Sequence, residues 1–246
     1  MKKYVAAAVL IAAAAQTMSA DVLGFGAGVG SFMGKISGEA QYEGDRFKAK
    51  DAGLDKSNNI YAWAYLEHFV PILPNLRVDL NKFSEKGDAQ IPLKFGGQDF
   101  AANAATDLKA DTLAITAYYN LPIPLVDLRL GLSALNLDAK LKVAGAGAEK
   151  SASGSGVLPT LYLGARFDIP AAPIGLEADA KYVSYDGSRA ADYRVKADLT
   201  LEFLLKFAVE VGYRQQEIVV KDKMSGFDGE LDIKIAGAFA GVSARF

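Results

Sequence analysis

The strongest constraint on this chain is a two-residue alternation of apolar with small or polar side chains, which recurs up to the last residue. Val209 and Val211, for example, flank Glu210. Successive side chains of a β-strand point to opposite faces of a sheet, so this period predicts strands with one apolar and one polar face. The alternating segments are 23–30, 59–69, 76–81, 112–119, 126–133, 161–168, 176–182, 194–203, 207–214 and 231–246. They predict an all-β fold of about ten strands.

The connections expected between these strands alternate in length. The short ones are 71–75, 121–125, 169–175 and 204–205, and the long, polar ones are 34–58, 84–111, 144–156, 186–191 and 221–229. Short turns on one rim and long loops on the other are typical of outer-membrane barrels. We therefore predict a closed antiparallel transmembrane β-barrel with short periplasmic turns and long extracellular loops. Eight or twelve strands stay open, because 34–58 and 84–111 could each contain a hairpin.

Alternation alone does not say which face is outside, since a soluble barrel turns its apolar side chains inward. Charges of alternating sign follow the polar face, and a basic residue at mid-depth in lipid would cost about 2–4 kcal/mol. Aromatic residues near strand ends suit the two membrane interfaces: Phe25, Tyr119, Phe167, Tyr182, Phe203 and Phe246. We expect the apolar face to meet lipid, which makes closure obligatory because an open edge would leave backbone groups unsatisfied.

The charged residues of the polar face are then the candidates that line the lumen. They are Arg77, Asp79, Asp127, Arg129, Arg166, Asp168, Glu177, Asp179, Lys181, Arg194, Lys196, Asp198, Glu202, Glu210 and Arg214. Seven are positive and eight negative, and a one-signed ring that would indicate ion selectivity is not visible. Two interpretations stay open: a salt-bridged structural core, or a narrow polar path for small solutes.

Four glycines share one face of the first predicted strand: Gly24, Gly26, Gly28 and Gly30. The dinucleotide fingerprint needs glycines at i, i+2 and i+5, and the i+5 position fails here. We expect these glycines to leave room for Tyr61, Trp63 and Tyr65 of the next strand, whose face also carries Glu67.

Two strands show a slip in the phase of their alternation. In the last strand the apolar set changes phase near Gly237, which predicts a β-bulge. A similar slip occurs near Ala134, beyond which Leu135 and Leu137 fall on the opposite phase.

The sequence offers little support for a catalytic site or a metal site. His68 is the one histidine of the chain, close to Pro71, and we expect an interfacial anchor or turn-capping residue on the outer face rather than a catalytic base. The acidic residues Asp222, Asp228 and Glu230 do not match a calcium loop. We predict neither an enzyme nor a metal or cofactor site, and the absence of cysteine excludes disulfides.

The N-terminus has the pattern of a secretory signal peptide. Lys2 and Lys3 precede the apolar stretch 4–15, and a short polar region ends at Ala20. We predict a signal peptide over 1–20, a barrel domain over 21–246 and export to the Gram-negative outer membrane. Removal of the signal peptide takes away Lys2 and Lys3 and changes the formal charge from −2 to −4. This mild acidity argues against nucleic acid as a partner.

The block that runs from Tyr65 to Arg77, the start Asp21-Val-Leu-Gly-Phe-Gly and the terminal Phe246 resemble an uncharacterised family of small Gram-negative outer-membrane β-barrel proteins. The size is similar to that of outer membrane protein W-type barrels. The resemblance implies the compartment and the barrel, and no substrate.

The C-terminal strand resembles the signal read by the barrel assembly machinery. Gly241 and Phe246 match that pattern, whereas Phe239 and Ala244 depart from it. The expected partners are this machinery, outer-membrane lipid with lipopolysaccharide, and a small solute. Two functions stay open: a narrow channel or binding barrel for small solutes, or a closed structural barrel that interacts through its extracellular loops.

Overall fold

The computed structural model describes residues 23–202, 206–221 and 229–246 and places nearly all of them in or between long antiparallel strands. The strands are β1 (Leu23–Tyr42), β2 (Asp45–Lys48), β3 (Lys56–His68), β4 (Asn75–Asp88), β5 (Leu93–Phe95), β6 (Gln98–Phe100), β7 (Ala105–Ile123), β8 (Val126–Gly145), β9 (Ala148–Asp168), β10 (Ile174–Tyr185), β11 (Ser188–Glu202), β12 (Lys206–Val220) and β13 (Gly229–Arg245). No helix in the described ranges is long and apolar enough to cross a membrane. The predicted signal peptide and Phe203 lie outside the described residues.

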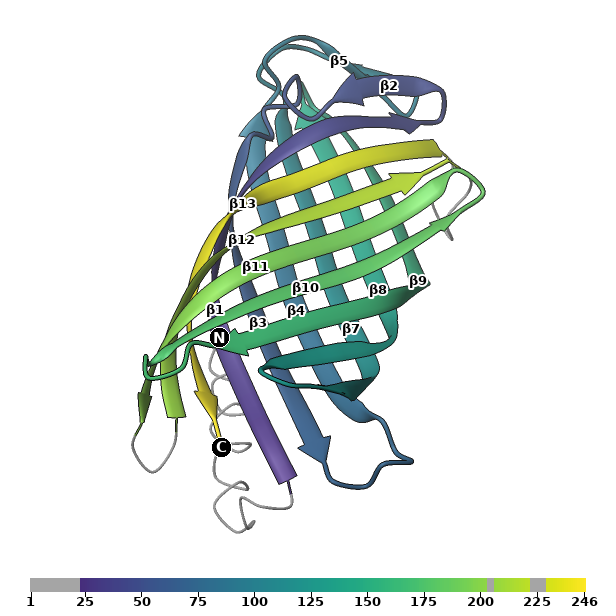
Figure 1. Cartoon of the computed structure of the whole chain (residues 1–246). Coiled ribbons are helices and arrows are strands. Elements are labelled where there is room, and N and C mark those ends of the chain that lie inside the picture. Colours follow the sequence, from purple (N-terminus) through teal and green to yellow (C-terminus); the bar gives the residue numbers. More distant parts are fainter. Residues whose placement is uncertain (1–22, 203–205, 222–228) are drawn as a thin grey trace.

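Ten of these strands close into a barrel (Figure 1). Around the wall they follow the order β13, β12, β11, β10, β9, β8, β7, β4, β3, β1, and β1 pairs again with β13. The closing seam runs from Gly26 opposite Arg245 to Tyr42 opposite Gly229. The prediction of a closed antiparallel barrel of ten strands is confirmed.

The remaining strands stand outside the wall. β2 pairs with the distal end of β1, and β5 and β6 form a separate hairpin. β2 lies within the predicted loop 34–58, and β5 and β6 lie within the predicted loop 84–111. These three short strands do not increase the number of strands in the barrel wall. We call segments 43–55 and 89–104 the cap, because β2 and β5 lie at the end of the barrel opposite the start of β1 and the C-terminus (Figure 1).

Several strands run further than their alternation predicted. The connection β8–β9 has only Ala146 and Gly147, and β10–β11 has only Asp186 and Gly187. All four residues have positive φ, between 46° and 81°, as type I′ hairpin turns require. The predicted bounds of the loops 144–156 and 186–191 are therefore wrong.

The two phase slips are not irregularities of the backbone. β13 pairs with β1 and β12 in one unbroken register on both sides of Gly237, so the predicted bulge is wrong. β8 likewise pairs without a break through Ala134. Each slip must therefore reflect a change in what surrounds the strand along its length, while its pairing stays regular.

That change is visible along β8. Its outward side chains pass from the exposed Leu130 and Leu132 to Asp138, whereas its inward side chains pass from Arg129 to Leu137. Apolar residues thus move from the outer face to the inner face at one level of the wall. We call the part of the barrel towards the start of β1 and the end of β13 the terminal half and the part towards the cap the cap half.

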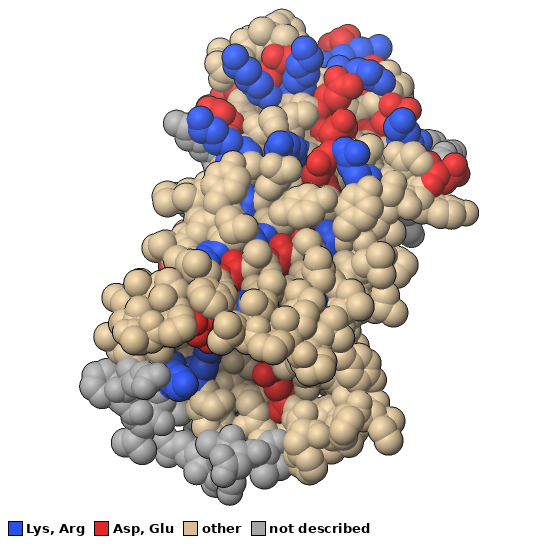
Figure 2. All heavy atoms as spheres, in the orientation of Figure 1, with Lys and Arg blue, Asp and Glu red and all other residues tan. Residues whose placement is uncertain are grey.

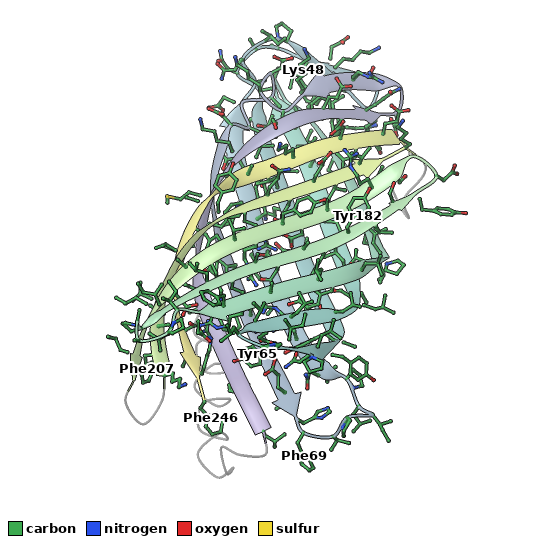
Figure 3. All side chains as sticks on the ribbon, viewed as in Figure 1. Lys48, Tyr65, Phe69, Tyr182, Phe207 and Phe246 are labelled. Atoms are coloured by element: carbon green, nitrogen blue, oxygen red, sulfur yellow. The ribbon has the colours of Figure 1, made fainter. Side chains whose placement is uncertain are left out.

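The outer surface follows the same division. In the terminal half it is a belt of exposed apolar side chains: Val29, Ile60, Leu66, Leu76, Leu80, Ile115, Leu130, Leu132, Leu161, Leu163, Leu176, Val195, Leu199, Leu201, Phe207, Val209, Val211 and Val242. Figure 2 shows that most of the charge on this face of the molecule gathers at the cap end, above a largely uncharged band. In Figure 3, Phe207 and Tyr182 project from the wall, and Phe69 and Phe246 lie at the terminal end.

Candidate functional site

The interior of the terminal half holds a network of charged side chains, which we call the ionic cluster. It comprises Glu67, Arg77, Asp79, Asp127, Arg129, Arg166, Glu177, Asp179, Lys181, Arg194, Lys196, Asp198, Glu210 and Arg245, contributed by eight strands. The two-residue period of each strand sends these side chains inward, while the residues between them face outward.

At its centre the ionic cluster spans the lumen. Arg77 and Asp79 on β4 pair with each other at 3.0 Å, and Asp79 also accepts a 2.7 Å hydrogen bond from Lys181 Nζ on β10. Arg194 on β11 hydrogen-bonds to Asp179. Arg77 is 2% and Asp79 4% exposed, so both charges have left water and depend on each other for compensation.

Glu177 lies where several cations converge. Its carboxylate oxygens are 3.6 Å from Arg77, 3.5 Å from Arg129, 3.8 Å from Arg194 and 3.3 Å from Lys196. One carboxylate therefore lies within ion-pair distance of cations from β4, β8 and β11. A buried charge with this many opposite neighbours is a structural node of the cluster.

Glu210 on β12 links that strand to the aromatic residues of β3. It is fully buried and accepts hydrogen bonds from Tyr61 Oη at 2.8 Å, Trp63 Nε1 at 3.1 Å and Lys196 Nζ at 2.9 Å. The Lys196 ammonium also lies 4.6 Å from the centre of the Trp63 ring, in the range of a cation–π contact.

The glycines of β1 make room for these rings. Gly26, Gly28 and Gly30 stand opposite Tyr65, Trp63 and Tyr61 in the register. A Cβ atom on Gly28 would come within 2.6 Å of the Trp63 ring. The steric interpretation of the glycine series is confirmed.

Nearer the terminal rim, Asp198 binds two arginines. Arg166 Nη1 donates to it at 2.7 Å and Arg245 Nη2 at 3.1 Å. Asp168 bonds to Arg166 at 2.6 Å, but its side chain is 70% exposed, so it lies at the rim rather than inside the network. Asp127 pairs with Arg129 at the same rim.

Arg214 forms a separate group at the boundary of the two halves. Its guanidinium donates to Asp192 at 2.8 and 2.6 Å and to the side-chain oxygen of Asn81. Glu202 is the one candidate whose side chain lies outside the described residues. The structure thus brings together most of the candidates, with Asp168 at the rim and Arg214 apart.

Sequence reasoning missed two charged residues of this interior. Arg245 has the same phase as Phe239 on β13, and this alternation could have identified it. Asp192 has the phase of Arg194, but the strand was predicted to begin only at 194, whereas β11 begins at Ser188. Asp192 was missed because the strand was predicted to begin too late, whereas Arg245 lies within the predicted segment 231–246 and follows from its alternation.

The interior of the cap half is apolar. Its buried cluster joins inward side chains of the wall to side chains of the cap, and includes Phe32, Ile36, Ala40, Phe47, Leu54, Phe83, Leu93, Phe95, Phe100, Val143, Ile235 and Phe239. Phe47 and Phe95 of the cap meet edge to face, with ring centres 5.6 Å apart. This half therefore has the packed core of a water-soluble barrel.

His68 is the last residue of β3, where the β3–β4 turn begins. Its Nε2 lies 3.2 Å from the Pro74 carbonyl, and its backbone N–H donates to Asn75 Oδ1 at 3.0 Å. This agrees with a turn-capping role. Among the described residues no group of His, Asp and Glu side chains has the arrangement of a metal site.

No protein-family model matches this chain, and no curated protein matches it in sequence. Among solved structures it is similar to the attachment invasion locus protein Ail of Yersinia pestis in complex with the heparin analogue sucrose octasulfate (12% identity, 92% of this chain and 99% of that chain, TM-score 0.44). It is also similar to a Pseudomonas aeruginosa FadL homologue (11%, 92% and 90%, 0.34) and to Neisserial surface protein A (12%, 90% and 97%, 0.31). These values are too low to transfer a function.

Proposed function

We propose that the protein is an integral outer-membrane barrel whose terminal half lies in the lipid, with the termini in the periplasm and the cap outside the cell. The exposed apolar belt supports this, because such a continuous surface is unfavourable in water and suits hydrocarbon. The even number of barrel strands puts the start of β1 and the end of β13 on one side, and the connections on that side are short.

We propose further that the barrel is closed to free passage of solutes and works at the cell surface. The observation that carries this is the ionic cluster, whose bonds join β4 to β10 and β3 to β12 across the lumen. In the cap half, the packed aromatic side chains fill the same axis. Of the two functions that the sequence left open, this geometry favours the closed surface barrel over the narrow channel.

The orientation can be tested by labelling single cysteines, since the chain has none of its own. Asp99→Cys places a thiol at an exposed position of β6 in the cap, and Ile72→Cys places one in the β3–β4 turn, where Ile72 is 84% exposed. A membrane-impermeant maleimide on intact cells should label only the Asp99→Cys protein, and both after lysis. Labelling of the Ile72→Cys protein alone would reverse the orientation.

Closure can be tested by conductance in planar bilayers. The native protein should give no steady current at any voltage, because ion-paired side chains occupy the lumen. A variant with both Asp79→Ala and Lys181→Ala removes a neutral pair from the centre and is the sensitised control. Stable open-channel steps from the native protein would refute the proposal.

A further inference from the structure

The apolar core of the cap half is not completely filled. It encloses a cavity of about 100 Å³, lined by wall residues from β1, β7, β8, β9, β12 and β13 and by Phe47, Leu54 and Phe95 of the cap. A second hollow of about 30 Å³ lies towards the ionic cluster and shares Leu137 and Ile233 with the first. Native interiors leave few voids larger than a water molecule, so a cavity at this position needs an explanation.

Small inward residues at one level of the wall create the cavity. Ala139 on β8 stands between its register partners Ala110 on β7 and Gly154 on β9, and all three line the cavity. Large side chains lie on either side along the barrel axis. Phe32 borders the smaller hollow, and Phe95 covers the cavity from the cap. The hollow is therefore a space between two aromatic layers.

The lining decides what this space can hold. Its side chains are almost entirely alanine, leucine, isoleucine and aromatic residues. A buried water needs two to four polar partners, and an apolar cavity of about 150 Å³ stays dry and binds benzene. We propose that the cavity is a binding site for a small apolar molecule, of the size of a single hydrocarbon ring or a short branched chain, that enters from the cell exterior.

The cover of the cavity is suited to such entry. The β5–β6 hairpin makes no ladder with the barrel wall. It is tied to β2 through Asp45, which accepts a 2.7 Å hydrogen bond from the Gly97 N–H and pairs with Lys94 at 3.6 Å. These polar contacts and the packing of Leu93, Phe95 and Phe100 in the apolar core hold the hairpin over the cavity without strand pairing to the wall, whereas the ionic cluster blocks the opposite side. The site is thus open to binding from the surface and not to passage through the lumen.

The test uses the full barrel in lipid nanodiscs with ¹³C-methyl isoleucines, titrated with benzene and followed by NMR. Ile233 lines the cavity, and Ile115 is 51% exposed on the lipid-facing wall. We expect a saturable shift of the Ile233 methyl and a linear, unsaturable shift of the Ile115 methyl, which reports benzene dissolved in the lipid.

Two variants of β8 complete the test. Ala139→Leu fills the cavity and should abolish the saturable shift, whereas Ala134→Leu adds the same atoms to the outer face and should retain it. Ala110→Leu fills the cavity from β7 and replaces Ala139→Leu if that variant fails to fold. A linear Ile233 shift in the native protein, or an unchanged saturable shift in the filled variant, would overturn the inference.

The inference does not depend on closure of the lumen. Channel activity in planar bilayers would refute the closed barrel and leave the saturable shift unaffected. Loss of the saturable shift would refute the binding site and leave the conductance result unaffected.

Discussion

Long strands such as β8 and β13 run through both the terminal half and the cap half of this barrel, yet the two halves have opposite surfaces. In the terminal half, apolar side chains face outward and charges pair inside; in the cap half, charges face outward and aromatic rings pack inside. The ladders β7–β8, β8–β9, β12–β13 and β1–β13 keep one register through both halves, so the ladder alone does not specify what the barrel encloses. The solvent outside each half decides which face must be apolar.

The two interiors also differ in how they are stabilised. At the centre of the ionic cluster the charges are buried and are compensated by partners from the same and from other strands. In the cap half, burial of apolar surface and close packing stabilise the core. Removal of one partner should therefore be most costly in the terminal half.

The largest effect is expected for Arg77→Leu, which leaves Asp79 and Glu177 buried with fewer cations. Loss of one partner from a buried ionic network costs about 3–5 kcal/mol. The control Arg46→Leu removes an arginine whose side chain is 54% exposed and should change the free energy of unfolding by no more than about 0.5 kcal/mol. Urea unfolding in lipid vesicles measures both. Equal values would mean that the ionic cluster does not stabilise the terminal half.

Leu137→Ala tests the apolar core of the cap half. Leu137 is 1% exposed inside the barrel, where it borders the cavity, and truncation of a buried leucine costs about 2–5 kcal/mol. Leu132→Ala on the same strand is the control, because Leu132 is 65% exposed on the outer wall, where lipid can fill the space. The same urea assay should show a clearly larger loss for Leu137→Ala. A larger loss for the control would contradict a packed core in the cap half.

Leu132→Arg and Asp138→Arg locate the boundary between the halves from outside. An arginine on the lipid face costs about 2–4 kcal/mol at mid-depth and about 0–1 kcal/mol near the interface. Both positions face outward on β8, with Leu132 in the apolar belt and Asp138 beyond it. Stability of the refolded protein should fall only for Leu132→Arg. A comparable loss at Asp138 would extend the hydrocarbon level into the cap half.

The smallest effect is expected for Glu85→Gln in the cap half. Burial and the nearby Asp55 raise the pKa of Glu85. The folded protein then binds more protons than the unfolded chain, so this group lowers stability as pH rises from below its unfolded pKa, about 4.3, to above its raised folded pKa. Between pH 3 and pH 7 the native protein should lose slightly more stability than Glu85→Gln in paired urea titrations. If the stability of the native protein and of Glu85→Gln changed with pH in the same way, the raised pKa of Glu85 would not contribute to the pH dependence.

Much of the fold could be predicted from the sequence, because the two-residue period is a property of each strand by itself. The ten barrel strands and the inward side of Glu67 and Trp63 follow from it. The ends of the strands could not be predicted in the same way. Beyond the belt both faces carry mixed residues, and turns as short as Asp186–Gly187 were taken for parts of loops.

The phase slips show why a local pattern can mislead. Near Gly237 and Ala134 the sequence was interpreted by the rule that apolar side chains face outward, which required a bulge in the last strand. The register stays regular, and the rule itself changes where the wall leaves the belt. The sequence pattern shows that the apolar side chains change face, but it does not show why. The reason is the position of each residue along the barrel axis, which only the closed barrel defines.

By itself the sequence determined the strands, their two faces and the need for a closed wall, since alternation and backbone hydrogen bonding are local requirements. Only the tertiary structure decided which charges meet. Asp79 and Lys181 are 102 positions apart in the chain and touch because closure and strand tilt bring β4 and β10 together across the lumen. The cavity behind Phe95 likewise depends on the cap folding back over the barrel. Such contacts depend on the relative positions of distant strands, which no single segment specifies.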